Sequence, residues 1–206
     1  TPNEEAARDY LTLFEQFAPL ADYLAINVSS PNTLGLRRLQ ARDALEDLLG
    51  QLAGQRMGKS PTHPLTHSPN HPITQSPNHL ITLPLLVKLA PDLSDEELDD
   101  ALEAITRTGM DGVIATNTTL RRDGLRAAKA RETGGLSGAP LPCQSTEIIA
   151  KIHQRTGGKL PIIGVGGIMS PDDAKAKLEA GAALVQVYTG LIYAGPGLVQ
   201  AIVKSL

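Results

Sequence analysis

Residues 85–115 read LLVKLAPDLSDEELDDALEAITRTGMDGVIA and contain one complete unit of a parallel α/β fold. The run Leu85–Leu89 is almost wholly apolar, which is typical of a strand that is buried on both faces. A helix start is predicted at Ser94 and Glu97, since each side chain can accept a hydrogen bond from the backbone N–H of the other. A second apolar run, Gly112–Ala115, follows that helix. The stretch therefore predicts a strand, a helix and a second strand in sequence.

The same alternation of apolar runs and amphipathic segments extends over the rest of the chain. Three further strands are expected, at Tyr23–Val28, Pro161–Val165 and Leu184–Tyr188. Helices are expected at 4–18, Asp43–Met57, 94–109, Ser145–Arg155, 171–181 and Gly197–Leu206. About five such strand–helix units predict a parallel sheet, either doubly wound or part of a (β/α)8 barrel.

Polar residues or glycines follow every expected strand at its C-terminal end. Barrels of the TIM type build their active sites from the loops after all of their strands. A doubly wound sheet binds its ligand mainly at one switch point. The pattern therefore favours an α/β fold that forms part of a (β/α)8 TIM barrel.

One segment differs from the rest of the chain. Residues 60–83 read SPTHPLTH, SPNHPITQ and SPNHLITL, three copies of one octapeptide without a charged residue. Proline at this density disfavours a helix and a central strand. We therefore predict an extended, largely disordered low-complexity insert on the face opposite the strand C-termini. Its histidines could suggest metal binding, but such a chain cannot preorganise a coordination geometry, and no metal site is predicted. These histidines are His63, His67, His71 and His79.

Composition excludes several classes of protein. A length of 206 residues corresponds to about one domain. A formal net charge of −3 offers no basic surface, so nucleic acid is not an expected partner. The single cysteine, Cys143, excludes a disulfide framework and is typical of a reducing compartment. No apolar run reaches the ~18 residues that a membrane-spanning helix needs.

The first strand is followed by the sequence NVSSPNT, from Asn27 to Thr33. Asparagine side chains donate and accept hydrogen bonds, which suits a planar ligand with carbonyl and N–H groups. A serine between Asn27 and Asn32 could act on a proton of that ligand. A polar β-turn without a binding role is the alternative, because Ser, Pro and Asn are common turn residues.

The later strand ends predict an anionic ligand. Lys88 stands alone in an apolar strand, so it should point to an anion or an electron-rich cofactor, unless it reaches the surface. The third strand ends in Thr116-Asn117-Thr118. Glycine clusters at 134–138 and 164–167 could aim amide groups at a phosphate, although helix caps also use glycine. Together with Lys88 they predict a phosphorylated cofactor.

Six stretches in order resemble the dihydroorotate dehydrogenase family, and most of all its quinone-dependent class 2 branch. They are NVSSPNTLGLR (27–37), VKLAPDLS (87–94), GVIATNTTL (112–120), TGGLSGAPL (133–141), LPIIGVGGI (160–168) and LVQVYTG (184–190). Class 2 members carry serine where class 1 members carry a cysteine base, and that position is Ser30 here. Cys143 lies elsewhere in the chain.

The resemblance implies roles for particular residues. Ser30 would remove the C5 proton of dihydroorotate, and Thr33 would relay that proton through a water. The pyrimidine and its carboxylate would be held by Asn27, Asn32, Asn117 and Thr118. The flavin FMN would be contacted by Asn27, Lys88, Thr116, Gly138, Gly167, Tyr188 and Thr189. Of these, Gly167, Tyr188 and Thr189 would surround its phosphate.

The resemblance also implies the place of this chain in a larger enzyme. Residues 1–206 would form the C-terminal part of one FMN-binding TIM-barrel domain, about its last five βα units. The implied activity is oxidation of dihydroorotate to orotate in pyrimidine (UMP) biosynthesis, with a quinone as the final electron acceptor. An N-terminal part outside this chain would attach the enzyme peripherally to the cytoplasmic side of the cell membrane. A non-catalytic remnant and an FMN barrel enzyme for a related pyrimidine remain as alternatives.

Overall fold

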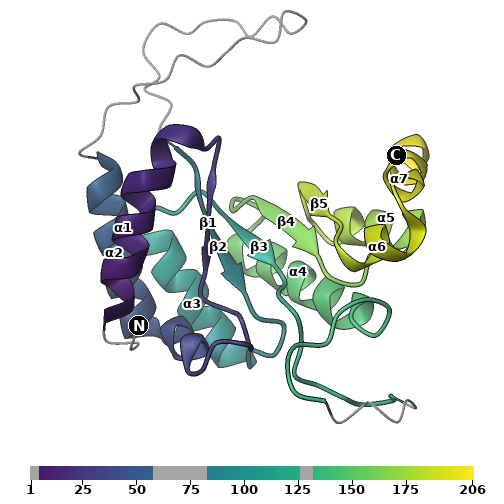
Figure 1. Ribbon diagram of the computed structural model, residues 1–206, viewed down its shortest axis with the longest axis horizontal. Coiled ribbons are helices and arrows are strands. Elements are labelled where there is room, and N and C mark those ends of the chain that lie inside the picture. The colour runs from purple at the N-terminus through teal and green to yellow at the C-terminus, as the bar shows by residue number, and fades with distance from the viewer. Residues whose placement is uncertain (1–4, 58–82, 126–131) are drawn as a thin grey trace, which may run out of the picture.

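The structure is a computed structural model that describes residues 5–57, 83–125 and 132–206 (Figure 1). Its strands are β1 (Leu24–Asn27), β2 (Leu85–Leu89), β3 (Gly112–Ala115), β4 (Ile162–Val165) and β5 (Leu184–Gln186). Its α-helices are α1 (Ala6–Phe17), α2 (Arg42–Met57), α3 (Asp95–Arg107), α4 (Pro142–Thr156), α5 (Pro171–Glu179), α6 (Thr189–Ala194) and α7 (Gly197–Ser205). Two 3-10 helices, η2 (Ala18–Leu20) and η3 (Leu36–Gln40), flank β1. Apart from Leu83, the octapeptide insert at 60–83 lies outside the described residues.

The five strands pair in parallel and in chain order, β1-β2-β3-β4-β5. A doubly wound sheet would reverse its strand order at a switch point. The order within the described sheet has no reversal, so it confirms the expectation of a partial (β/α)8 barrel. Helices α1 to α5 form a row along the sheet, each packed against the next, and α7 lies across the molecule from α1 and α2 (Figure 1).

Alternate residues of each strand point to opposite faces of the sheet. One row of register partners contains Ile26, Val87, Val113 and Ile162, which are buried in the apolar core with the helices. The next row contains Asn27, Lys88, Ile114, Ile163 and Leu184. Ile114 at the centre of this row is buried, but Asn27 and Leu184 are exposed and Lys88 and Ile163 are half-buried, so the second face is open toward its two edges.

The prediction that the strands are buried on both faces holds only for the middle of the sheet. All four residues of β3 are buried, whereas Leu184 and Gln186 of β5 are exposed. A central strand has neighbours on both sides, but β5 pairs only with β4 among the described residues.

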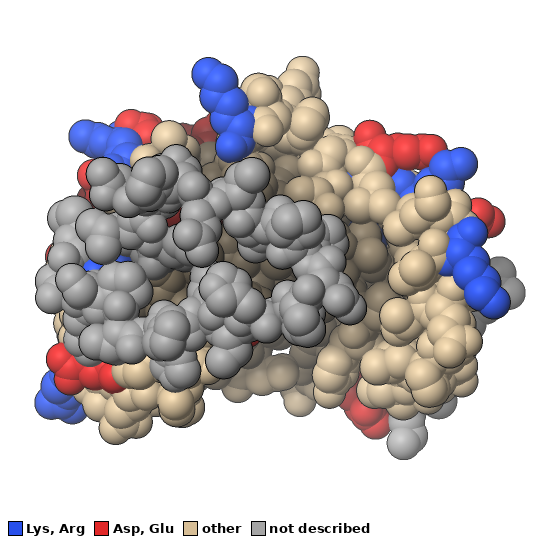
Figure 2. Space-filling view, turned by 90° about the horizontal axis from the view of Figure 1, so that it is seen from above, with Lys and Arg blue, Asp and Glu red and all other residues tan. Residues whose placement is uncertain are grey.

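Figure 2 shows that the charged side chains lie mainly around the outline of the molecule in a view from above.

The helix ends follow the chain's capping signals. The predicted capping box of α3 is present: Glu97 N donates to Ser94 Oγ, and Ser94 N donates to Glu97 Oε2. Ser170 Oγ caps α5 by accepting from the N–H of Asp173 at 3.3 Å, and the Asp173 carboxylate accepts from the N–H of Met169. Both helices therefore begin where the sequence predicts.

The structure corrects the start of one predicted helix and the end of one predicted strand, and it adds one α-helix. Helix α4 begins at Pro142 rather than Ser145, because proline at the first helical position needs no hydrogen-bond partner for its nitrogen. Strand β5 ends at Gln186 rather than Tyr188, since Gln186 pairs with Val165, the last residue of β4. Helix α6, which starts directly after Tyr188, was not predicted.

Candidate active site

The C-terminal ends of β1 and β2 place two predicted ligand-binding side chains next to each other. Asn27 and Lys88 are register partners on the open face of the sheet. The hydroxyl of Tyr10, from α1, donates to the backbone carbonyl of Asn27 at 2.8 Å and fixes this strand end. The two side chains therefore share one edge, as the sequence predicts for parallel strands.

Asn117 joins the end of β3 to the end of β1. Its Nδ2 donates to Asn27 Oδ1 at 3.1 Å and to Ser29 Oγ at 3.0 Å. Its Oδ1 accepts from the N–H of Thr118 at 2.8 Å. These bonds orient the two asparagine amides before any ligand binds. The donor group of Asn27, Nδ2, makes no bond to the part of the chain that the structure describes, so it is free for a ligand.

Ser30 and Asn32 lie in the turn between β1 and η3. Ser30 Oγ accepts from the N–H of Asn32 at 3.3 Å, which leaves the hydroxyl proton free to donate. Asn32 Oδ1 accepts from the N–H of Gly135 at 3.2 Å and so reaches the glycine loop after β3. Thr33 is exposed, and no hydrogen bond between its side chain and Ser30 occurs in the structure. The Thr33 relay therefore stays a prediction.

Gly135 shows why the loop after β3 needs glycine. A Cβ atom there would lie 1.8 Å from Thr118 Oγ1 and 2.8 Å from Pro31 Cγ. Only a residue without a side chain allows this approach between the loop and the Thr118 strand end. Asn32 and Thr118 are thus brought to the same place by one glycine.

Lys88 is half-buried on the open face and makes no hydrogen bond or ion pair with any residue that the structure describes. Burial removes water from its ammonium group and lowers the pKa of Lys88 below the ordinary lysine value. A partly desolvated ammonium without an anion is a site for a negatively charged or electron-rich ligand.

The glycine loops after β3 and β4 are closely packed. Gly138 has a φ of 78°, and a Cβ on it would lie 3.0 Å from Thr189 Cγ2. Gly167 has a φ of 77°, and a Cβ there would lie 2.3 Å from the nitrogen of Pro142. Thr189 Oγ1 donates to Ser137 Oγ at 2.9 Å, which ties the start of α6 to the loop after β3.

Two residues predicted to contact the flavin, Thr116 and Tyr188, differ in how far they are exposed. Thr116 is buried, and its hydroxyl donates to the carbonyl of Asn117 at 3.0 Å. Tyr188 is 74% exposed on the surface just before α6. The structure thus groups the asparagines, Ser30 and Lys88 at the ends of β1 to β3, and Gly138 with Thr189 beside α6, while the side chain of Tyr188 is largely exposed.

Sequence reasoning missed the charged residues that connect the strand ends. Arg37 and Asp92 form an ion pair at 2.7 Å between the loops after β1 and β2. Ser29 is fully buried and bonded to both Asn27 and Asn117. The available signal was that Arg37 is the only charged residue within 27–37 and that Asp92 is the only acidic residue within 87–94.

Among the described residues, no group of three or more His, Cys, Asp or Glu side chains could hold a metal ion. In the same part of the chain, no helix is long and apolar enough to cross a membrane. The four histidines of the insert lie outside the described residues.

Comparison with known proteins gives one consistent result. The sequence model of the family described as dihydroorotate dehydrogenase matches residues 2–206. A relative from Anaeromyxobacter sp. (strain Fw109-5), named dihydroorotate dehydrogenase (quinone), is 48% identical over 207 residues and is matched over 52% of its length. A relative of the same name from Vibrio parahaemolyticus is also 48% identical and is matched over 57% of its length. Both alignments cover 100% of the chain.

The structural comparison agrees with the sequence comparison. A crystal structure of DHODH from Eimeria tenella in complex with ferulenol superposes with a TM-score of 0.85 and 38% sequence identity. The match covers 98% of this chain and 53% of that one. The chain thus spans about half the length of the curated relatives and of the solved structure that it matches.

Proposed function

Because this chain belongs to the dihydroorotate dehydrogenase family, we propose that the protein oxidises dihydroorotate to orotate in pyrimidine biosynthesis. The proposed hydride acceptor is FMN, and a quinone is the proposed final electron acceptor. The activity is proposed for the protein completed to the length of its relatives. The observation that supports it best is the convergence of Asn27, Ser30, Asn117 and Lys88 at one edge of the sheet.

Two observations on the described residues support FMN as the cofactor. Lys88 offers a partly desolvated ammonium without a partner among the described residues, which suits the electron-rich edge of a flavin. Gly138 and Gly167 both have a positive φ and pack closely against Thr189 and Pro142, and glycine loops of this kind can aim backbone amides at a phosphate. Thr116, Tyr188 and Thr189 complete the proposed cofactor contacts. When bound, FMN supplies the acceptor for the hydride that leaves C6 of the substrate.

The chain's own residues would bind and deprotonate the substrate. The amides of Asn27, Asn32 and Asn117, with the hydroxyl of Thr118, would pair with the carbonyl, N–H and carboxylate groups of dihydroorotate. Ser30 Oγ would accept the proton from C5 as the hydride leaves C6. A serine hydroxyl is a weak base, so its own proton has to leave at the same time. Thr33 would pass that proton to water.

The proposed catalysis depends largely on side chains that are already held in position before the substrate binds. The Asn117 side chain is already bonded to Asn27 and Ser29 in the described structure, so little reorganisation is needed when the substrate binds. Lys88 would stabilise negative charge that develops next to it. A protein that delivers electrons to a quinone has to reach a membrane, and we propose a peripheral position on the cytoplasmic face of the cell membrane for the completed enzyme.

The proposal can be tested by completing the chain with the matching N-terminal half of the Anaeromyxobacter sp. (strain Fw109-5) relative. The fusion should purify with FMN and reduce a quinone analogue in the presence of dihydroorotate. Dihydrouracil serves as the control substrate, since it lacks the carboxylate that Asn117 and Thr118 would bind. A preference for dihydrouracil would favour the related-pyrimidine alternative. A fusion that folds but neither binds FMN nor reduces quinone would favour the non-catalytic remnant.

A further inference from the structure

One side chain connects the loops after three consecutive strands. Arg37, from η3, donates through Nε to the carbonyl of Ser29 at 3.1 Å and through Nη2 to the carbonyl of Thr118 at 2.9 Å. Its Nη1 donates to Asp92 Oδ2 at 2.7 Å. The guanidinium thus bonds the loops after β1, β2 and β3 at once.

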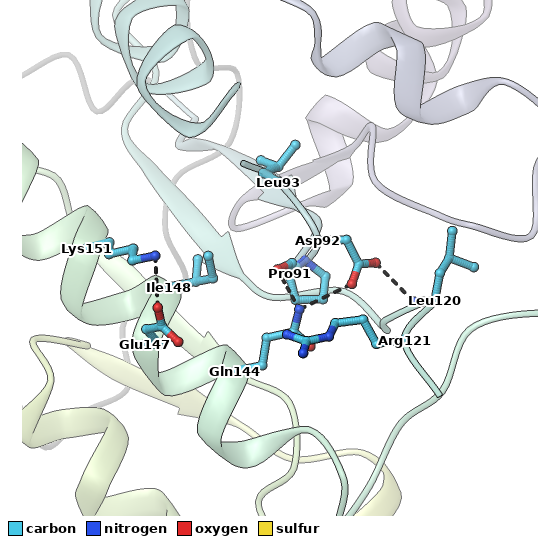
Figure 3. A pocket seen from close by; sticks show the side chains of 9 residues that line it. All are labelled: Pro91, Asp92, Leu93, Leu120, Arg121, Gln144, Glu147, Ile148 and Lys151. Carbon is cyan, nitrogen blue, oxygen red and sulfur yellow. Dashed lines mark hydrogen bonds and ion pairs between the residues drawn. The ribbon is translucent and has the colours of Figure 1, made fainter. Parts of the chain in front are cut away.

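Asp92 is held from several sides. Its carboxylate accepts from the hydroxyl of Thr119, from the N–H of Leu120 at 3.0 Å and from Gln144 Nε2 at 3.2 Å. Gln144, on α4, also donates to the carbonyl of Pro91 at 2.9 Å. Figure 3 shows the carboxylate of Asp92 with Gln144 on one side and Leu120 on the other.

The electrostatics of Asp92 agree with this arrangement. Burial alone would raise the pKa of its carboxyl group, but the bonds from Thr119, Arg37, Leu120 and Gln144 outweigh burial, and the pKa lies below the ordinary value. The side chains of Arg37 and Asp92 are only 20% and 18% exposed. By contrast, the Arg42 and Glu103 side chains of a surface ion pair are 39% and 46% exposed. The Arg37–Asp92 pair is therefore a fixed internal contact rather than a solvated surface pair.

Both backbone carbonyls that Arg37 holds adjoin the proposed site. Ser29 directly precedes Ser30, the proposed base, and Thr118 is itself a proposed substrate contact. A shift of about 1 Å in such groups can cost on the order of 100-fold in rate. The position of these two loops relative to each other therefore decides whether Ser30 reaches the substrate.

We propose that Arg37 and Asp92 are positioning residues that hold Ser30 and the Asn117–Thr118 pair in one reactive geometry. The proposal rests on the function proposed above. Neither side chain needs to touch the substrate. The planar fork of arginine reaches two carbonyls and a carboxylate together, whereas a lysine ammonium is a single point charge on a flexible stem. Charge alone is therefore not sufficient at position 37.

The test uses the completed fusion and compares Arg37→Lys with Arg38→Lys. Arg38 is the matched control, since it lies on the same 3-10 helix, is exposed, and its side chain makes no bond among the described residues. Arg37→Lys should lower kcat about 10- to 100-fold while the FMN content stays at the level of the parent. Arg38→Lys should match the parent in both measurements.

A second comparison separates positioning from general stability. In a Ser30→Ala background the proposed base is absent, so Arg37→Lys should lower the remaining rate less than about threefold. Asp92→Asn keeps an oxygen acceptor and should lose less activity than Asp92→Ala, with FMN retained in both. A merely structural role would instead cause loss of FMN or an equal loss in both backgrounds.

The outcomes are distinguishable. A parent fusion without dihydroorotate oxidation overturns the proposed function, and the positioning role with it. An active parent whose Arg37→Lys variant has an unchanged kcat overturns the positioning role alone. The same holds if Arg37→Lys costs as much with Ala as with Ser at position 30.

Discussion

The two sides of the candidate site are built in different ways. The loops after β1, β2 and β3 are joined by side-chain hydrogen bonds, such as those of Asn117 and Arg37. The loops around Gly138 and Gly167 are shaped by backbone that leaves no room for a side chain. We propose that the first side, called the chemical side below, carries out the chemistry and that the second, called the phosphate side, holds the cofactor.

The two sides also differ in how many apolar side chains are buried beneath them. The core between β1–β4 and the helices buries many large apolar side chains, among them Leu49, Leu89 and Ile149. The cluster next to β5, α5 and α7 buries only Ile168, Ala174, Leu198 and Ile202. Leu184, Ile192 and Val203 on that side are 62%, 68% and 67% exposed. The chemical side thus rests on a packed core, whereas the phosphate side is only partly covered within the described residues.

The largest effect is expected from Ser30→Ala in the completed fusion. Removal of a proton acceptor lowers the rate of substrate oxidation by roughly 100- to 10,000-fold. FMN should remain bound, since Ser30 lies on the chemical side. The measurement is stopped-flow bleaching of the flavin absorbance by dihydroorotate. Ser30→Cys should keep partial activity because a thiol can accept the same proton. An undiminished rate in Ser30→Ala would show that another group is the base.

Gly167→Ala should weaken FMN binding, whereas Ser30→Ala should lower the rate and leave FMN bound. The new Cβ would lie 2.3 Å from Pro142 N, at a φ of 77° that side chains avoid, so the loop and the start of α4 have to move apart. We expect FMN to bind at least about tenfold more weakly, or ~1.4 kcal/mol. Gly197→Ala is the control, because a Cβ there meets no atom within 4 Å. Flavin content after gel filtration measures the effect, and equal retention in both variants would contradict the proposed division.

The common position of the proposed site residues could be predicted from the sequence, whereas the side-chain contacts that connect their loops could not. Asn27, Ser30, Lys88 and Asn117 all lie at or near the C-terminal end of an apolar run, so their common edge follows from parallel strand order. The contacts of Arg37 depend on residues up to 81 positions away, and no local pattern encodes such contacts.

The same limit applies to the elements around β5. The start of α5 is marked by Ser170 and Pro171, a local capping signal. Helix α6 has only six residues and no side-chain cap, so nothing local marks its start. The exposure of β5 depends on what lies beside it rather than on its own apolar composition.

One side chain, Lys177, supports the phosphate side through Ser145, and its charge depends on pH. Lys177 is fully buried, and its Nζ donates to Ser145 Oγ at 2.6 Å and to Thr146 Oγ1 at 3.2 Å. Ser145 Oγ in turn donates to the carbonyl of Gly166 at 2.8 Å. Burial is the main cause that lowers the pKa of Lys177 to about 8, although the negative charge of Asp173 opposes the shift.

Lys177→Met should therefore change how stability depends on pH. The unfolded chain holds the lysine proton up to its ordinary pKa of 10.5, whereas the folded protein releases it near 8. Between these values the unfolded state binds more protons, so the stability of the parent rises with pH. The rise amounts to about 3 kcal/mol at most, and Lys177→Met should lack it. Urea unfolding of both fusions at pH 7 and pH 10 measures the difference, and identical pH dependence would contradict a proton release by Lys177.

The smallest effect is expected from the octapeptide insert. Helix α2 ends at Met57 and β2 begins at Leu85, so the segment between them joins the N-terminal end of β2. The proposed chemistry lies at the other end of that strand, where Lys88 is. Leu83 packs against the core and should be kept. A matched variant therefore replaces only residues 60–82 with a Gly/Ser stretch of equal length, which avoids any change in loop closure.

This replacement should change kcat/KM by less than about tenfold, or ~1.4 kcal/mol of transition-state stabilisation. FMN content should also stay at the level of the parent, because neither side of the site includes the segment. The replacement removes four of the five histidines, so titration with zinc checks the predicted absence of a metal site in the same pair of proteins. Stoichiometric zinc binding that disappears with the replacement would overturn that prediction, and a larger loss of activity would show that the insert acts on the site from the opposite end of the sheet.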